Sequence, residues 1–107
     1  SNGELIWSNS SKSKRILDVS KAREINKILE KSVSEGNGIA AAIEGKKVFG
    51  KTGTSDGNRD LWFIGSINNL TTGIWLGYDN NKESNITSGN SANLWKLYNR
   101  NIINSKI

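Results

Sequence analysis

The chain has 107 residues, a net charge of +5 from 15 Lys and Arg against 10 Asp and Glu, and no His, Cys, Pro or Met. This length suits a single domain. Without Cys and His, the chain lacks the ligands of zinc fingers, haem and iron–sulfur sites, a disulfide framework, and the Ser-His-Asp and Cys-His catalytic arrangements. We therefore expect no metal and no cofactor, and any nucleophile has to be Ser, Thr, Lys or a carboxylate.

The positive charge is spread along the chain, and its densest runs are Lys12–Arg15 and Lys46-Lys47. A charge of this size suits an anionic partner, but it is also ordinary for a soluble surface. A small basic binding module without enzyme activity therefore stays as an alternative function, although we expect no nucleic-acid partner. No apolar stretch approaches the ~20 residues of a membrane span, so none is expected in this chain.

Residues 1–19 are expected to form an N-terminal hairpin or extension. Residues 4–7 have the composition of a short strand, and residues 15–19 could return as its partner. Ser20 then resembles a helix N-cap. Apolar residues at helical spacing follow as far as Val33, which predicts a helix that ends at residues 35–38, where the sequence tolerates positive φ.

The rest of the chain predicts an α+β fold, in which an antiparallel sheet is packed by an N-terminal and a C-terminal helix. The expected elements are a helical turn at 39–43, a strand through 48–54, a turn at 55–59, strands at 61–67 and 71–78, and a helix from about residue 89. Asn68-Asn69 makes a tight hairpin connection between the last two strands. We expect Trp62, Trp75 and Trp95 to pack in the core.

Residues 45–52 match the phosphate-binding pattern G-x-x-x-x-G-K-T, which suggests a nucleotide-binding protein as a further alternative. That loop needs a strand before its first glycine and a helix that opens at its Lys-Thr pair. Here Val48-Phe49, inside the pattern, resemble the strand itself. Residues 53–58 are poor helix sequence. The context therefore disfavours the nucleotide-binding interpretation.

A second motif uses the same lysine. The segments 50–55 (GKTGTS), 59–65 (RDLWFIG) and 73–79 (GIWLGYD) resemble the C-terminal part of the transpeptidase domain of penicillin-binding proteins, and most closely the bifunctional class A type. The helix end at Gly36–Gly38 and the segment Asn93–Lys96 resemble further parts of that domain. The resemblance implies that residues 20–107 are the C-terminal portion of an incomplete, β-lactamase-like transpeptidase domain.

The resemblance also implies an activity for the parent protein. Members of the family cross-link the peptide stems of peptidoglycan by acyl transfer from D-Ala-D-Ala through a serine ester, and β-lactams occupy the same cleft. The chemistry uses the motifs S-x-x-K, S-x-N and K-T-G and needs no His. A class A parent carries a glycosyltransferase domain and a membrane helix upstream, and it works on the extracytoplasmic (periplasmic) face of the bacterial inner membrane.

Four residues of this chain match the K-T-G motif and its flank. By resemblance, Lys51 places its ammonium in the cleft, and the hydroxyls of Thr52 and Thr54 bind the terminal carboxylate of the substrate. Gly53 leaves room for an acyl donor that lies along the strand edge like an added strand. The backbone N–H of Thr54 is one of two donors to the oxyanion.

The other two motifs are not convincingly present. Ser11–Lys14 fits S-x-x-K but lies in a polar turn, without an apolar helix to hold Ser over Lys. Ser66–Asn68, Ser88–Asn90 and Ser91–Asn93 fit S-x-N, but all three follow the K-T-G motif, whereas the family order places S-x-N before it. We interpret all four as coincidences, so no nucleophile is expected in this fragment. The isolated chain should then be inactive, and surface that normally meets the rest of the domain could pair two copies.

Overall fold

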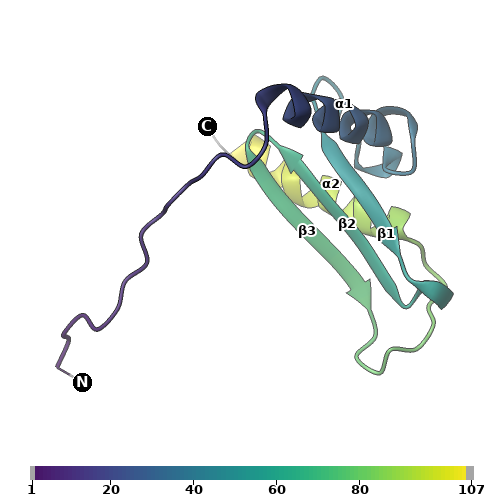
Figure 1. Cartoon of the computed structure of the whole chain (residues 1–107). Coiled ribbons are helices and arrows are strands. Elements are labelled where there is room, and N and C mark those ends of the chain that lie inside the picture. The colour runs from purple at the N-terminus through teal and green to yellow at the C-terminus, as the bar shows by residue number, and fades with distance from the viewer. Residues whose placement is uncertain (1, 106–107) are drawn as a thin grey trace.

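The computed structural model describes residues 2–105, which form a three-stranded antiparallel sheet with two α-helices (Figure 1). The elements in chain order are α1 (Val19–Glu35), η1 (Ile39–Ala41), β1 (Phe49–Thr54), η2 (Asp56–Asn58), β2 (Asp60–Ile67), β3 (Leu70–Gly77) and α2 (Ser88–Ser105). The predicted α+β fold with its antiparallel sheet and two helices is confirmed. None of the described helices is long and apolar enough to cross a membrane.

Strand β2 is the centre of the sheet, because it pairs with β1 on one side and with β3 on the other. The β2–β3 connection is the predicted two-residue turn. Its residues Asn68 and Asn69 have φ values of 51° and 65°. Two positive φ values suit the right-handed twist of a tight hairpin, and asparagine tolerates them better than most residues.

Helix α1 forms where the apolar spacing predicts it, but two details of its ends differ from the expectation. The N-cap is Asp18 rather than Ser20, which lies in the first turn, and no side chain caps the helix. At the other end, Gly36 has a φ of −117°, so positive φ is not what selects the glycine. A Cβ at Gly36 would lie 2.9 Å from the carbonyl oxygen of Ser32, which makes lack of space the reason.

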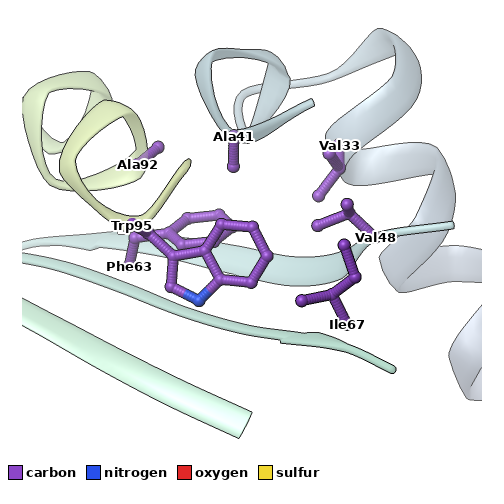
Figure 2. Close-up of a cluster of buried hydrophobic side chains, with 7 residues drawn as sticks. All are labelled: Val33, Ala41, Val48, Phe63, Ile67, Ala92 and Trp95. Atoms are coloured by element: carbon purple, nitrogen blue, oxygen red, sulfur yellow. The ribbon is translucent and has the colours of Figure 1, made fainter. Parts of the chain in front are cut away.

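The core lies between the sheet, α2 and the residues around η1. Its buried members are Val33, Ala41, Val48, Phe63, Ile67, Ala92 and Trp95. Figure 2 shows the indole of Trp95 in the middle of this cluster, beside Phe63. The two rings meet edge to face with their centroids 5.4 Å apart, a favourable geometry for aromatic pairs.

Polar contacts fix α2 to the sheet as well. The indole N–H of Trp95 donates to the carbonyl oxygens of Gly65 at 3.2 Å and Thr72 at 3.1 Å. The hydroxyl of Ser91, which is fully buried, donates to the carbonyl of Leu61 at 2.7 Å. Since buried polar groups cost free energy unless they are paired, these bonds specify where α2 sits on the sheet.

Of the three tryptophans expected in the core, only Trp95 is buried there. Trp62 and Trp75 face each other across β2 and β3, and each is 42% exposed. Side chains alternate between the two faces of a strand, so the burial of Leu61 and Phe63 against α2 places Trp62 on the opposite face. The core assignment of Trp62 and Trp75 was therefore wrong.

Residues 2–17 contain no helix or strand and run away from the sheet as an extension (Figure 1). The strands expected at residues 4–7 and 15–19 do not form. The first segment is exposed to solvent, with Ile6 95% exposed, and Val19 at the end of the second segment is already the first residue of α1. A two-stranded ribbon without a packed face is marginal in water, which explains why the apolar run alone does not produce a hairpin.

Candidate functional site

The K-T-G-T segment forms the edge of the sheet. Lys51 to Thr54 are the last four residues of β1, and β1 pairs only with β2 among the strands of residues 2–105. An edge strand leaves one row of backbone N–H and C=O groups free to pair with an extended peptide. The segment therefore lies where a substrate could add to the sheet.

The register shows which backbone groups point away from β2. The N–H of Ser55 donates to the carbonyl of Asp60 at 3.0 Å, so the backbone of Ser55 faces β2. The direction alternates along an antiparallel ladder, and Thr54 and Thr52 therefore direct their N–H and C=O groups to the open edge. The Nζ of Lys51 donates to the Thr52 carbonyl at 3.0 Å, which agrees with this direction.

Lys51 and Thr52 come together at this edge. The Nζ of Lys51 lies 3.5 Å from the hydroxyl of Thr52, and the lysine side chain is exposed. Within residues 2–105, Lys51 forms no ion pair with a carboxylate. An ammonium without a carboxylate partner, next to a hydroxyl and a free peptide edge, can attract an anionic group.

Gly53 leaves the surface open beside these groups. A Cβ built at Gly53 would meet only the Cβ of Trp62, at an ordinary 3.5 Å. Nothing in the fold therefore forbids a side chain here, in contrast to Gly50 on the same strand. Thr54 ends the strand and is exposed. The four sequence-predicted residues thus lie in one row along the edge.

A cavity of about 490 Å³ adjoins Lys51, between α1 and the face of the sheet opposite to α2. Leu29, Phe49 and Ile64 give it an apolar floor, and Ser66 and Asn68 lie at the hairpin end. A volume of this size is within the range of small-molecule and peptide side-chain sites. The cavity extends the strand edge into a groove.

The serines that fit the other motifs are engaged elsewhere. Ser11 and Lys14 lie in the exposed extension, outside any helix. Ser91 is buried against β2, and Ser88 is the first residue of α2. Ser66 lines the same cavity as Lys51, but its hydroxyl shares a 2.6 Å hydrogen bond with the hydroxyl of Thr71.

The phosphate-loop alternative does not fit this geometry. Lys51 and Thr52 lie inside β1, so no helix N-terminus opens at them. Since a phosphate loop needs that helix end, residues 45–52 match the pattern in sequence but not in structure. The part of the chain that the structure describes also contains no group of three or more Asp and Glu side chains arranged to hold a metal ion.

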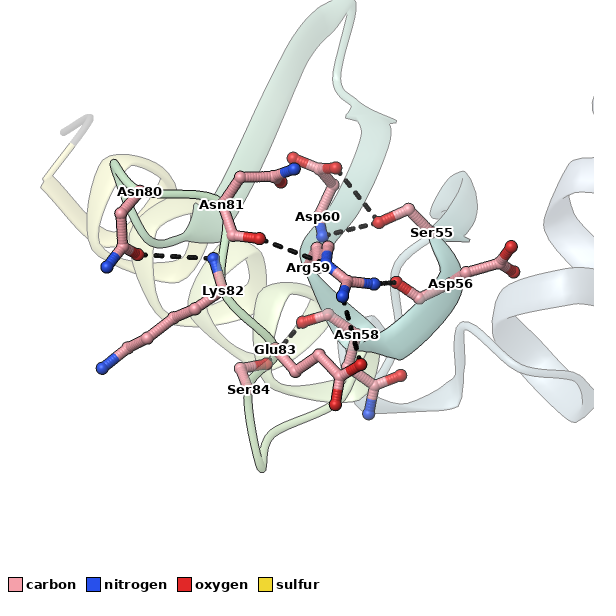
Figure 3. Close-up of polar contacts among 10 residues, drawn as sticks. All are labelled: Ser55, Asp56, Asn58, Arg59, Asp60, Asn80, Asn81, Lys82, Glu83 and Ser84. Atoms are coloured by element: carbon pink, nitrogen blue, oxygen red, sulfur yellow. Dashed lines mark hydrogen bonds and ion pairs between the residues drawn. The ribbon is translucent and has the colours of Figure 1, made fainter.

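The sequence predicts only a turn at residues 55–59, but the structure has a polar cluster there around Arg59. The guanidinium of Arg59 donates to the carbonyls of Asp56 and Asn81 and pairs with the carboxylate of Glu83 at 3.1 Å. Figure 3 shows Arg59 between the turn after β1 and the loop after β3. The signal that could have found the cluster is an Arg-Asp pair directly before a strand.

A comparison with known protein families shows which family this chain belongs to. The family described as the penicillin binding protein transpeptidase domain matches residues 4–99, which is most of the chain. The chain belongs to this family. The resemblance expected from the K-T-G-T strand and the two Trp-containing strands is thereby confirmed.

Curated relatives agree with the family. Penicillin-binding protein 1A of Rickettsia typhi is 39% identical over 69 residues, which cover 64% of this chain and 9% of the relative. Penicillin-binding protein 1A of Aquifex aeolicus is 36% identical, covering 73% and 11%, and penicillin-binding protein 1B of Vibrio cholerae is 38% identical, covering 60% and 8%. The chain therefore spans about a tenth of the length of these relatives.

Proposed function

We propose that this chain is the C-terminal part of a peptidoglycan D,D-transpeptidase of class A and forms one wall of its acyl-transfer cleft. The observation that carries the proposal is the free edge of β1, where Lys51, Thr52 and the outward backbone groups of Thr54 lie in one row. Family membership supports the reaction type, and the relatives' greater length supports a longer parent enzyme.

The geometry suggests how each group acts. A D-Ala-D-Ala stem lies along the free edge of β1 as an added strand, with its terminal carboxylate near the ammonium of Lys51 and the hydroxyls of Thr52 and Thr54. The N–H of Thr54 donates to the carbonyl oxygen that becomes negative when a serine attacks the carbonyl carbon. Gly53 keeps the approach to the edge clear.

The serine and its lysine base come from the rest of the domain. The serine hydroxyl loses its proton to that base and forms an ester, and the terminal D-Ala leaves with a proton. An amine of a second stem then attacks the ester and releases the serine. This chain supplies binding and charge stabilisation, and β-lactams enter the same cleft as acyl donors.

The face of the sheet opposite to α2 suits packing by the remainder of the domain. Trp62, Ile64 and Trp75 lie together on it and are 42%, 50% and 42% exposed. Contiguous apolar surface of this kind usually marks a contact with another protein surface. In the full enzyme, we place this face against the missing part, and a glycosyltransferase domain and membrane anchor lie further upstream on the extracytoplasmic side.

The proposal is tested by β-lactam labelling and intact mass spectrometry. The longer protein that contains this chain should gain one penicilloyl adduct, and peptide mapping should place the adduct outside residues 1–107. The isolated 107-residue chain should gain none, because it lacks the nucleophile. An adduct on a serine of this chain, or no adduct on the longer protein, would contradict the proposal.

A further inference from the structure

The turn after β1 is held by three hydrogen bonds between two residues. The N–H of Ser55 donates to the carbonyl of Asp60 at 3.0 Å. The hydroxyl of Ser55 accepts the N–H of Asp60 at 2.8 Å and donates to its carboxylate Oδ2 at 3.0 Å. Figure 3 shows both side-chain contacts. Ser55 directly follows Thr54, so these bonds fix the last peptide unit of the K-T-G-T strand.

The carboxylate of Asp60 is itself anchored from a second direction. Its Oδ1 accepts the indole N–H of Trp75 at 3.0 Å. Asp60 is the first residue of β2, and Trp75 belongs to β3. Each carboxylate oxygen therefore accepts from a different donor, and the two donors together define the orientation of the group. Through Asp60, the end of β1 is tied to both other strands.

This anchoring matters because of where the Thr54 N–H points. That group faces the open edge and has no partner in β2. Its peptide unit is held on one side, where Gly53 pairs with Trp62 in the ladder, and the bonds of Ser55 hold the residue that follows it on the other side. The ends of edge strands are also the part of a sheet that opens most readily. A donor to an oxyanion accelerates a reaction only if it is already aimed when the charge develops.

We propose that Ser55 and Asp60 are a positioning pair that holds the backbone N–H of Thr54 in the orientation of an oxyanion-hole donor. The inference rests on the proposed function. Neither side chain touches the substrate, since both act through the backbone next to Thr54. Loosening the pair slows the acylation step, whereas initial binding remains because Lys51 and Thr52 are unchanged.

The Arg59 cluster provides a matched control in the same turn. Arg59 bonds to Asp56, Asn81 and Glu83, and none of these contacts reaches Ser55 or Thr54. The side chain of Glu83 is 67% exposed, and an exposed ion pair contributes little to stability. Glu83→Gln therefore disturbs the turn's surface without disturbing the positioning pair.

The test compares Ser55→Val with Ser55→Thr, two side chains of nearly the same shape that differ in the hydroxyl. In the longer protein, rapid-quench kinetics with a β-lactam separate the acylation rate constant from the dissociation constant of the initial complex. Ser55→Val should lower the rate constant by about 10- to 100-fold, since misplacement by about 1 Å can cost that much. Its dissociation constant should not change, and Ser55→Thr and Glu83→Gln should match the unmodified protein.

Thermal unfolding of the same variants in the 107-residue chain shows whether they fold. Equal acylation by Ser55→Val and Ser55→Thr would overturn the positioning role. So would a Ser55→Val defect that comes with a lower unfolding midpoint and equally weaker binding, because that pattern is structural. Normal acylation by Lys51→Ala would instead overturn the proposed function, which separates the two failures.

Discussion

Two glycines of β1 have different roles, because one is packed against the core and the other lies at the open strand edge. Gly50 is buried, and a Cβ there would lie 2.4 Å from Cζ of Phe63 and 3.0 Å from the carbonyl oxygen of Ile64. Gly53 meets only the Cβ of Trp62, at 3.5 Å. The core therefore requires a glycine at position 50. The fold does not require one at position 53, so we attribute Gly53 to the open strand edge, where a substrate would approach.

This difference predicts opposite results for the same substitution. Gly50→Ala should destabilise the 107-residue chain by about 1–3 kcal/mol, because the methyl group overpacks against Phe63. Gly53→Ala should change the free energy of unfolding by no more than about 0.5 kcal/mol. Urea denaturation followed by circular dichroism measures both. Similar midpoints for the two variants would contradict the placement of Gly50 against the core.

At the scale of elements, the existence and order of the helices and strands could be predicted, because each follows from a local pattern. The apolar residues up to Val33 have helical spacing. Two segments rich in strand-forming residues, joined by Asn68-Asn69, are the signal of a hairpin. The N-cap at Asp18 and the reason for Gly36 could not be predicted, because both depend on how the chain turns in three dimensions.

The sequence also does not predict which face of the sheet each tryptophan occupies. Alternation fixes that Trp62 and Phe63 point in opposite directions, but it does not say which face α2 covers. The K-T-G-T row was found from a resemblance, since an exposed lysine followed by two threonines and a glycine carries no physical signal by itself. The Ser55–Asp60 bonds were missed because they join residues on either side of a turn.

The attachment of α2 to the sheet depends on Trp95. Trp95→Phe should cost about 2–4 kcal/mol, because it leaves a void and removes the donor of the Gly65 and Thr72 carbonyls. Trp62→Phe is the matched control, and its cost should stay below about 1 kcal/mol because Trp62 is half exposed and lies outside the core. Guanidinium denaturation of the chain measures both. Equal losses would contradict the central position of Trp95.

For the molecule as a whole, we expect a protease to cleave the N-terminal extension before it cleaves the packed part. Residues 2–17 make no regular structure, and Lys12, Lys14 and Arg15 in this stretch are exposed. Trypsin should therefore cut first at these residues and leave a resistant fragment that begins near Arg15, since exposed irregular segments are the preferred sites of cleavage. Mass spectrometry of a time course identifies the cuts. First cleavage inside α1 would contradict this division.

The distribution of exposed groups over the whole molecule supports its interpretation as one wall of a larger site. The cavity beside Lys51 and the half-exposed Trp62 and Trp75 lie on the face of the sheet that α2 does not cover. Under the proposed function, the remaining residues of the domain cover that side, and Lys51 is a cleft residue rather than an ordinary surface lysine.

The acylation rate of Lys51→Ala tests this central claim most directly. It is measured in the longer protein with a fluorescent penicillin, beside Lys47→Ala, which removes an equal charge from an exposed position outside the row. Lys51→Ala should acylate about a hundredfold more slowly, the size of effect seen when charge stabilisation in a cleft is removed, and Lys47→Ala should not change. Equal rates for the two variants would contradict the account.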